Sequence, residues 1–149
     1  MHRIIAVLVI CLSGFVSLQA QSAVKDLVNG FFMEYEAGDP ASAFAYANAL
    51  RPEAEGRRGA LNVADLQAKF IELEKQFGNY YGYDILVEQE LGPNFVRYVC
   101  FARYAYRPVR FTFEFYRPNS TWHLYALRID RRMNTEIKEQ SSKTFEFRY

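Results

Sequence analysis

Residues 95–130 of this chain read FVRYVCFARYAYRPVRFTFEFYRPNSTWHLYALRID. Apolar and polar side chains alternate through most of this stretch, which is the period of a strand with one buried face. Turn residues interrupt it at Arg107-Pro108 and at Pro-Asn-Ser-Thr, residues 118–121. Connections this short join antiparallel neighbours, because a parallel crossover needs about a dozen residues or more. The stretch therefore predicts three strands of an antiparallel meander, over residues 95–106, 109–117 and 122–132.

The segment before it completes the predicted fold. Residues 80–91 show the same alternation and precede a Gly-Pro-Asn turn, so they predict a first strand. Further upstream the apolar spacing changes to three or four, the period of an amphipathic helix. It predicts helices over residues 24–37, 40–50 and 63–77, the second opened by Asp39-Pro40 and the third capped by Asn62. The fold class is α+β, with three N-terminal helices packed on a four-stranded antiparallel sheet.

Turn lengths predict which strand residues face each other. A two-residue turn at Arg107-Pro108 pairs Tyr106 with Val109, and a four-residue loop leads from Arg117 to Trp122. This register gives one nearly apolar face, with charges at a single end. Buried charges are costly unless paired or hydrated, so we expect that end to be either an open mouth or a satisfied ion pair. The predicted ligand-binding residues are Tyr81, Tyr83, Tyr104, Tyr106, Phe111, Arg128 and Asp130.

The opposite face of the predicted sheet mixes apolar side chains such as Val99 and Tyr116 with charged ones such as Arg97 and Glu114. A contiguous patch of this kind predicts either a homodimer interface or cover by the C-terminal segment. That segment, residues 133–149, ends in alternating aromatic residues and is predicted to be a short extra strand or a loose tail.

The first 20 residues have the pattern of a secretion signal. A short positive start at His2-Arg3 precedes an apolar run to about residue 18, which is too short for a stable membrane span. We expect cleavage after Ala20, with Ser22 as the alternative, and no membrane span afterwards. The predicted organisation is a signal peptide over 1–20, one domain over 21–132 and the segment 133–149. The mature protein is expected in the periplasm or outside the cell.

Composition narrows the range of functions. The formal net charge is +1 and falls to zero if Arg3 is lost with the leader, so nucleic acid is not an expected partner. The chain after residue 20 holds one histidine, His123, and one cysteine, Cys100, too few for a conventional zinc site. Cys100 is predicted to be a buried thiol. No metal, cofactor or catalytic residue is predicted.

The segment FEFYRPNSTWHL, residues 113–124, carries a family resemblance. An aromatic strand, a turn and a tryptophan-led strand, preceded by three helices, resemble the nuclear transport factor 2-like (polyketide cyclase-like) superfamily, and in particular its small exported bacterial members of unknown function. The resemblance implies a curved, cone-like sheet around a pocket and frequent dimers through the outer sheet face. The superfamily contains isomerases, dehydratases and cyclases as well as non-catalytic modules, so the resemblance does not identify a function.

Three classes of function are consistent with the sequence. The expected one is a non-catalytic binding module that holds a small hydrophobic or anionic ligand, or a peptide, in an aromatic pocket. An alternative is an enzyme of the isomerase or dehydratase type, in which Asp130 is the general base and a tyrosine polarises a carbonyl. The third is a structural or assembly protein that acts through the outer sheet face. Because no complete catalytic motif is present, binding is favoured over catalysis.

Overall fold

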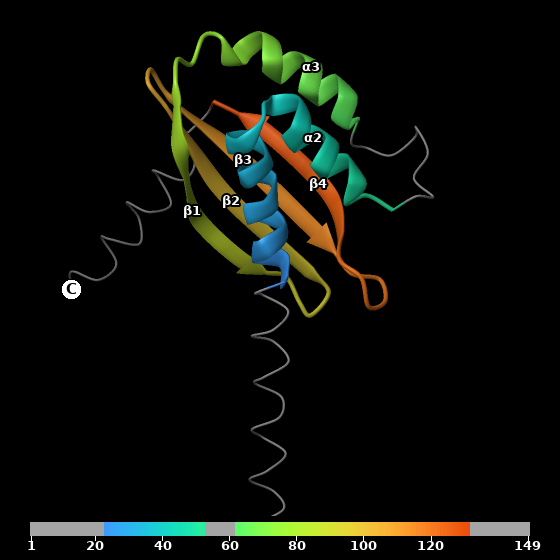
Figure 1. Ribbon diagram of the computed structural model, residues 1–149. Helices are drawn as coiled ribbons and strands as arrows, with labels where there is room; N and C mark the ends of the chain where they lie inside the picture. The colour runs from blue at the N-terminus through green and yellow to red at the C-terminus, as the bar shows by residue number, and fades with distance from the viewer. Residues whose placement is uncertain (1–22, 53–61, 132–149) are drawn as a thin grey trace, which may run out of the picture.

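In the part of the chain that the structure describes, three helices precede a four-stranded antiparallel sheet. The computed structural model describes residues 23–52 and 62–131. Residues 23–37 form the first helix, and α2 (Pro40–Ala49) and α3 (Val63–Glu74) follow it. The strands lie in the order β1 (Tyr80–Glu90), β2 (Phe95–Tyr104), β3 (Pro108–Tyr116) and β4 (His123–Asp130). Figure 1 shows the helices together on one side of the sheet, so the predicted α+β class is confirmed. The predicted leader and the segment 133–149 lie outside the described residues.

The helices begin where the sequence predicts. The Asp39 carboxylate accepts a hydrogen bond from the Ser42 amide at 2.9 Å, with Pro40 in the first turn of α2. The Asn62 side chain accepts one from the Asp65 amide at 3.2 Å at the start of α3. Such caps satisfy amide groups that have no partner inside the helix.

Aromatic rings fill the space between the helices and the sheet. Phe31 of the first helix lies at the centre, with its ring centroid 5.2 Å from those of Phe32 and Phe113 and 5.8 Å from those of Phe44 and Phe111. Three of these four contacts are edge-on and the fourth is tilted, which suits the charge distribution of aromatic rings. All five side chains are buried, and they form one core with strands β2, β3 and β4.

The β2–β3 connection differs from the predicted two-residue turn. Arg103 pairs with Pro108 and Ala102 with Val109, so the predicted pairing of Tyr106 with Val109 is wrong. The loop has other partners: the Tyr106 amide donates to the Phe77 carbonyl at 3.0 Å, and the Ala105 amide donates to that of Asn79 at 2.9 Å. The pairing shifts by an even number of residues, so the side chains of β2 and β3 that face the helices are still the predicted ones.

A bulge in β4 reverses the predicted orientation of its second half. Phe115 pairs with Leu124, but Glu114 pairs with Ala126, so one extra residue lies on β4. An extra residue turns every later side chain to the opposite face. Leu127 and Ile129 consequently face the helices, and Arg128 and Asp130 face away from them. The predicted inward position of these two charged side chains is wrong, and the bulge avoids the desolvation that burying them would require.

Strand β1 contains two irregularities. Its pairing with β2 shifts between Tyr80 and Tyr83 and again between Ile85 and Val87. Gly82 lies in the first of these shifts with φ 105°, a backbone conformation that suits glycine. Tyr83 keeps its predicted inward orientation, whereas Tyr81 is 62% exposed, so its predicted place on the apolar face is wrong.

Candidate functional site

The predicted mouth is not assembled as one site. Tyr83, Tyr104 and Phe111 belong to the helix-covered side, while Tyr81 and Tyr106 are exposed to solvent at 62% and 77%. Arg128 and Asp130 lie on the other face of the sheet, for the reason given above. The structure therefore brings together three of the seven predicted residues, and it places these three in packed surroundings.

The inward tyrosines make structural contacts. The Tyr83 ring stacks on Phe32 with centroids 3.8 Å apart, and its hydroxyl donates to Asn29 Oδ1 at 2.6 Å. The Tyr104 hydroxyl lies 2.7 Å from that of Tyr35, which in turn donates to Glu74. Burial is the main cause that raises the pKa of Tyr35 and of Tyr104 above the ordinary value. These hydroxyls stay protonated near neutral pH and join the first helix, α3 and β2.

The charged residues of the predicted site take part in ion pairs on the outer sheet face, the face that the three helices leave uncovered. Asp130 Oδ2 lies 2.6 Å from Arg110 Nη2. The buried carboxylate of Glu114, which is 3% exposed, binds Arg97 at 2.8 Å and Arg128 at 3.1 Å. Asp130 is thus held away from Tyr83 and Tyr104, the geometry opposite to that of the proposed general base. The predicted homodimer interface on this face stays a prediction.

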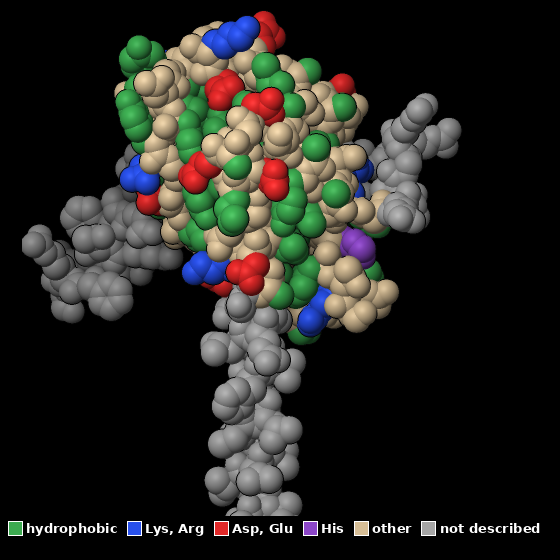
Figure 2. Space-filling view, in the orientation of Figure 1, with side chains coloured by type: hydrophobic (Ala, Val, Ile, Leu, Met, Phe, Trp, Pro, Cys, Tyr) green, Lys and Arg blue, Asp and Glu red, His purple; other side chains and the backbone are tan. Residues whose placement is uncertain are grey.

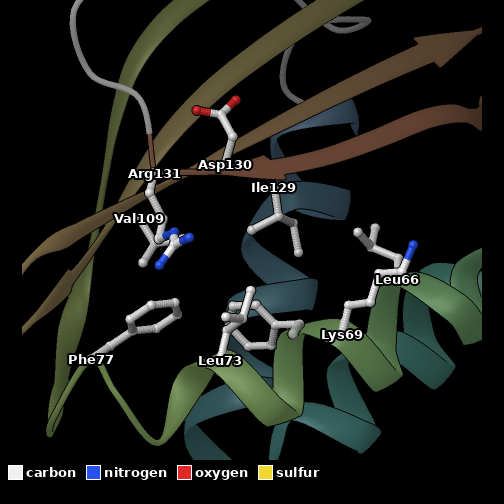
Figure 3. Close-up of a pocket in the computed structure, with 9 residues that line it drawn as sticks. Leu66, Lys69, Leu73, Phe77, Val109, Ile129, Asp130 and Arg131 are labelled. Atoms are coloured by element: carbon white, nitrogen blue, oxygen red, sulfur yellow. The ribbon is translucent and has the colours of Figure 1, made fainter.

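A cavity of about 390 Å³ lies elsewhere, between α3 and the adjoining ends of β3 and β4. We call it the α3–β4 cleft. It is lined by Leu66, Lys69, Phe70, Leu73, Phe77, Val109, Ile129, Asp130 and Arg131. Figure 3 shows Leu73 and Phe77 below the cleft and Ile129 above it. Six of the nine lining residues are apolar, and its volume falls in the range of small-molecule sites, about 300–1,000 Å³.

Two cationic side chains border this cleft. Within residues 23–52 and 62–131, neither Lys69 nor Arg131 forms an ion pair. Figure 3 shows the Arg131 guanidinium on the same side of β4 as Val109 and Phe77, whereas the Asp130 carboxylate points to the opposite side. This follows the alternation of the strand, in which Ile129 and Arg131 share one face. The cleft is therefore apolar inside, with positive charge at its edge.

A smaller hollow of about 170 Å³ lies at the start of β4. It is lined by Pro52, Tyr116, Pro118, His123, Leu124 and Tyr125. Of the described residues that line this hollow, His123 is the one with a basic side chain. Cys100, by contrast, is fully buried in β2, where burial raises the pKa of its thiol to about 12, so it is not a reactive thiolate at neutral pH.

Residues 23–52 and 62–131 contain no cluster of three or more histidine, cysteine, aspartate or glutamate side chains arranged to hold a metal ion. In the same residues, no helix combines the length and apolarity that crossing a membrane requires.

No family model, curated protein or solved structure matches this chain. The resemblance to the nuclear transport factor 2-like superfamily therefore stays a prediction drawn from residues 113–124 and the order of the elements.

The α3 side chains of the cleft lie on the amphipathic face that the spacing of three or four predicts for residues 63–77. This prediction is confirmed: Leu66, Phe70 and Leu73 have helical spacing and face the sheet side. The position of the cavity depends on how far α3 stands from the edge strand β4, which apolar spacing does not encode. The available signal was Arg131, which shares the strand phase of Leu127 and Ile129.

Proposed function

We propose that this protein is an exported, non-catalytic binding module that holds a small ligand in the α3–β4 cleft. The cleft itself is the observation that supports the proposal: a cavity of about 390 Å³ with apolar walls, next to a core whose other rings are closely packed. The apolar run and small residues at 4–20 support export.

The walls of the cleft offer a driving force for binding. Leu66, Leu73 and Ile129 are only half-buried although they belong to the edge of the apolar core. A ligand that covered them would remove apolar surface from water, which contributes about 25 cal/mol for each Å² covered. Phe70 and Phe77 are already buried and form a rigid floor, so little ordering would accompany binding.

The position of the Asp130 carboxylate is the reason for proposing binding and not catalysis. Among the described residues that line the cleft, Asp130 is the one acid, and its Oδ2 accepts hydrogen bonds from Arg110 Nη2 at 2.6 Å and Nε at 3.0 Å. A carboxylate engaged by two N–H donors of one guanidinium is held in one orientation, and here it is oriented away from the cleft. A general base must reach the proton that it removes.

Leu73→Trp tests the proposal, because the larger side chain would occupy the cleft. The probe is N-phenyl-1-naphthylamine, a neutral dye whose fluorescence rises in apolar surroundings. We expect saturable binding to the unsubstituted protein and at least about tenfold weaker binding to Leu73→Trp. Leu86→Trp is the control, since Leu86 is 38% exposed on β1, and it should leave the affinity unchanged. Equal binding to all three proteins, or none to the unsubstituted protein, would overturn the proposal.

A further inference from the structure

We infer that the ligand of the α3–β4 cleft is an aliphatic chain with one anionic end group, and that Arg131 holds that group. This inference rests on the proposed function and names the class of ligand. It follows from the shape of the apolar wall, from the charges at its edge and from the ion pairs that neighbouring arginines already form.

The apolar wall extends along α3. Leu66, Phe70 and Leu73 lie at helical positions four and three residues apart, so they line up over successive turns of one helix face. At 1.5 Å per residue, the span from Leu66 to Leu73 is about 10 Å. Ile129 lies across from them on β4. A strip of apolar side chains over this length suits an extended hydrocarbon chain.

Arg131 supplies the anion-binding group. Its guanidinium has donors in a planar fork that matches the oxygens of a carboxylate or phosphate. It lies on the cleft side of β4 in Figure 3, beside Val109 and close to the apolar wall. Arg131 is exposed, so salt partly screens an ion pair formed there, and the binding of an anion should weaken as the ionic strength rises. The Lys69 ammonium adds positive potential along the same cleft.

Neighbouring charges leave Arg131 available for a ligand. Arg110 binds Asp130, while Arg97 and Arg128 bind Glu114, so these three arginines already have carboxylate partners on the outer face. Asp130 is paired with Arg110 on the outer face, so its carboxylate does not compete for the Arg131 guanidinium at the edge of the cleft. Figure 2 shows acidic side chains over the centre of the helix-bearing face and basic ones at its margins. An anion would therefore be attracted to the cleft and repelled from that central surface.

The test compares ligands that share a ten-carbon chain and differ at one end. Decanoate, decyl phosphate, 1-decanol and decyltrimethylammonium are each used below micelle-forming concentrations to displace N-phenyl-1-naphthylamine. We expect decanoate and decyl phosphate to bind at least about tenfold more tightly than 1-decanol, and the cation to bind most weakly. Preference for one of the two anions would separate a carboxylate ligand from a phosphate ligand.

Arg131→Met removes the charge and keeps an apolar stem. It should bring decanoate to within about threefold of 1-decanol while the affinity for 1-decanol stays the same. Lys75→Met is the matched control: it removes one positive charge from the exposed end of α3, outside the cleft, and should leave the decanoate preference intact. Equal binding of decanoate and 1-decanol to the unsubstituted protein, or an unchanged preference in Arg131→Met, would overturn the inference. Absence of dye binding to the unsubstituted protein would instead overturn the proposed function.

Discussion

Phe31→Ala is expected to lower the free energy of unfolding by about 4 kcal/mol, in the upper part of the range for single core substitutions. Phe31 is 1% exposed and its ring contacts four other rings from the first helix, α2 and β3. The substitution would remove these contacts and leave a cavity where helices and sheet meet. Urea unfolding followed by circular dichroism measures the change.

Tyr106→Ala is the control for this substitution. It also removes an aromatic ring, but Tyr106 is 77% exposed, so we expect a change within about 0.5 kcal/mol. Phe31→Leu provides a smaller loss in the same direction if Phe31→Ala does not fold. A loss below about 1 kcal/mol for Phe31→Ala would contradict the described packing of the first helix on β3.

Glu114→Ala is expected to destabilise the protein by about 3 kcal/mol, the lower end of the range for breaking a buried ion pair. The Glu114 side chain is 4% exposed and binds Arg97 and Arg128, which are 36% and 61% exposed. Removal of the carboxylate would leave two positive charges close together. Water can reach both arginines in part, which is why we expect the lower end of the range.

Asp84→Ala is the matched control for Glu114→Ala. The Asp84–Arg103 pair, with N···O 3.4 Å, joins side chains that are both more than half exposed. Exposed pairs contribute about 1 kcal/mol at most, so the loss should be small. In the triple variant that also carries Arg97→Met and Arg128→Met, part of the stability lost in Glu114→Ala should return. Equal losses in Glu114→Ala and Asp84→Ala would show that Glu114 is not buried between the two arginines.

The order and type of the elements could be predicted because each depends on local signals. Asp39-Pro40 and Asn62 start α2 and α3, and short turns enforce the antiparallel sheet. Packing directions were also largely accessible, since Tyr104 and Phe111 do face the helices. These features follow from spacing and turn chemistry along the chain, without knowledge of distant contacts.

The candidate site was harder to predict because β-bulges decide which side chains of β1 and β4 face the helices. Strict alternation from Leu124 places Arg128 and Asp130 inward, but the apolar phase of β4 changes between Leu124 and Leu127. That change of phase is a readable signal of a bulge, as is Gly82 inside β1. The loop at Tyr106 had no such signal, because its partners are carbonyls before β1. The cavity depends on helix placement and could not be predicted from spacing.

Methyl NMR during titration with N-phenyl-1-naphthylamine tests most directly whether the α3–β4 cleft binds a ligand. The described lining of the cleft offers four methyl-bearing reporters, Leu66, Leu73, Val109 and Ile129, while Leu86 on β1 and Leu91 in the turn after β1 are exposed reporters elsewhere. We predict saturable shifts of the four cleft residues at one common affinity, with Leu86 and Leu91 unchanged. Shifts confined to Leu86 or Leu91, or no saturable shift at the cleft, would contradict the account.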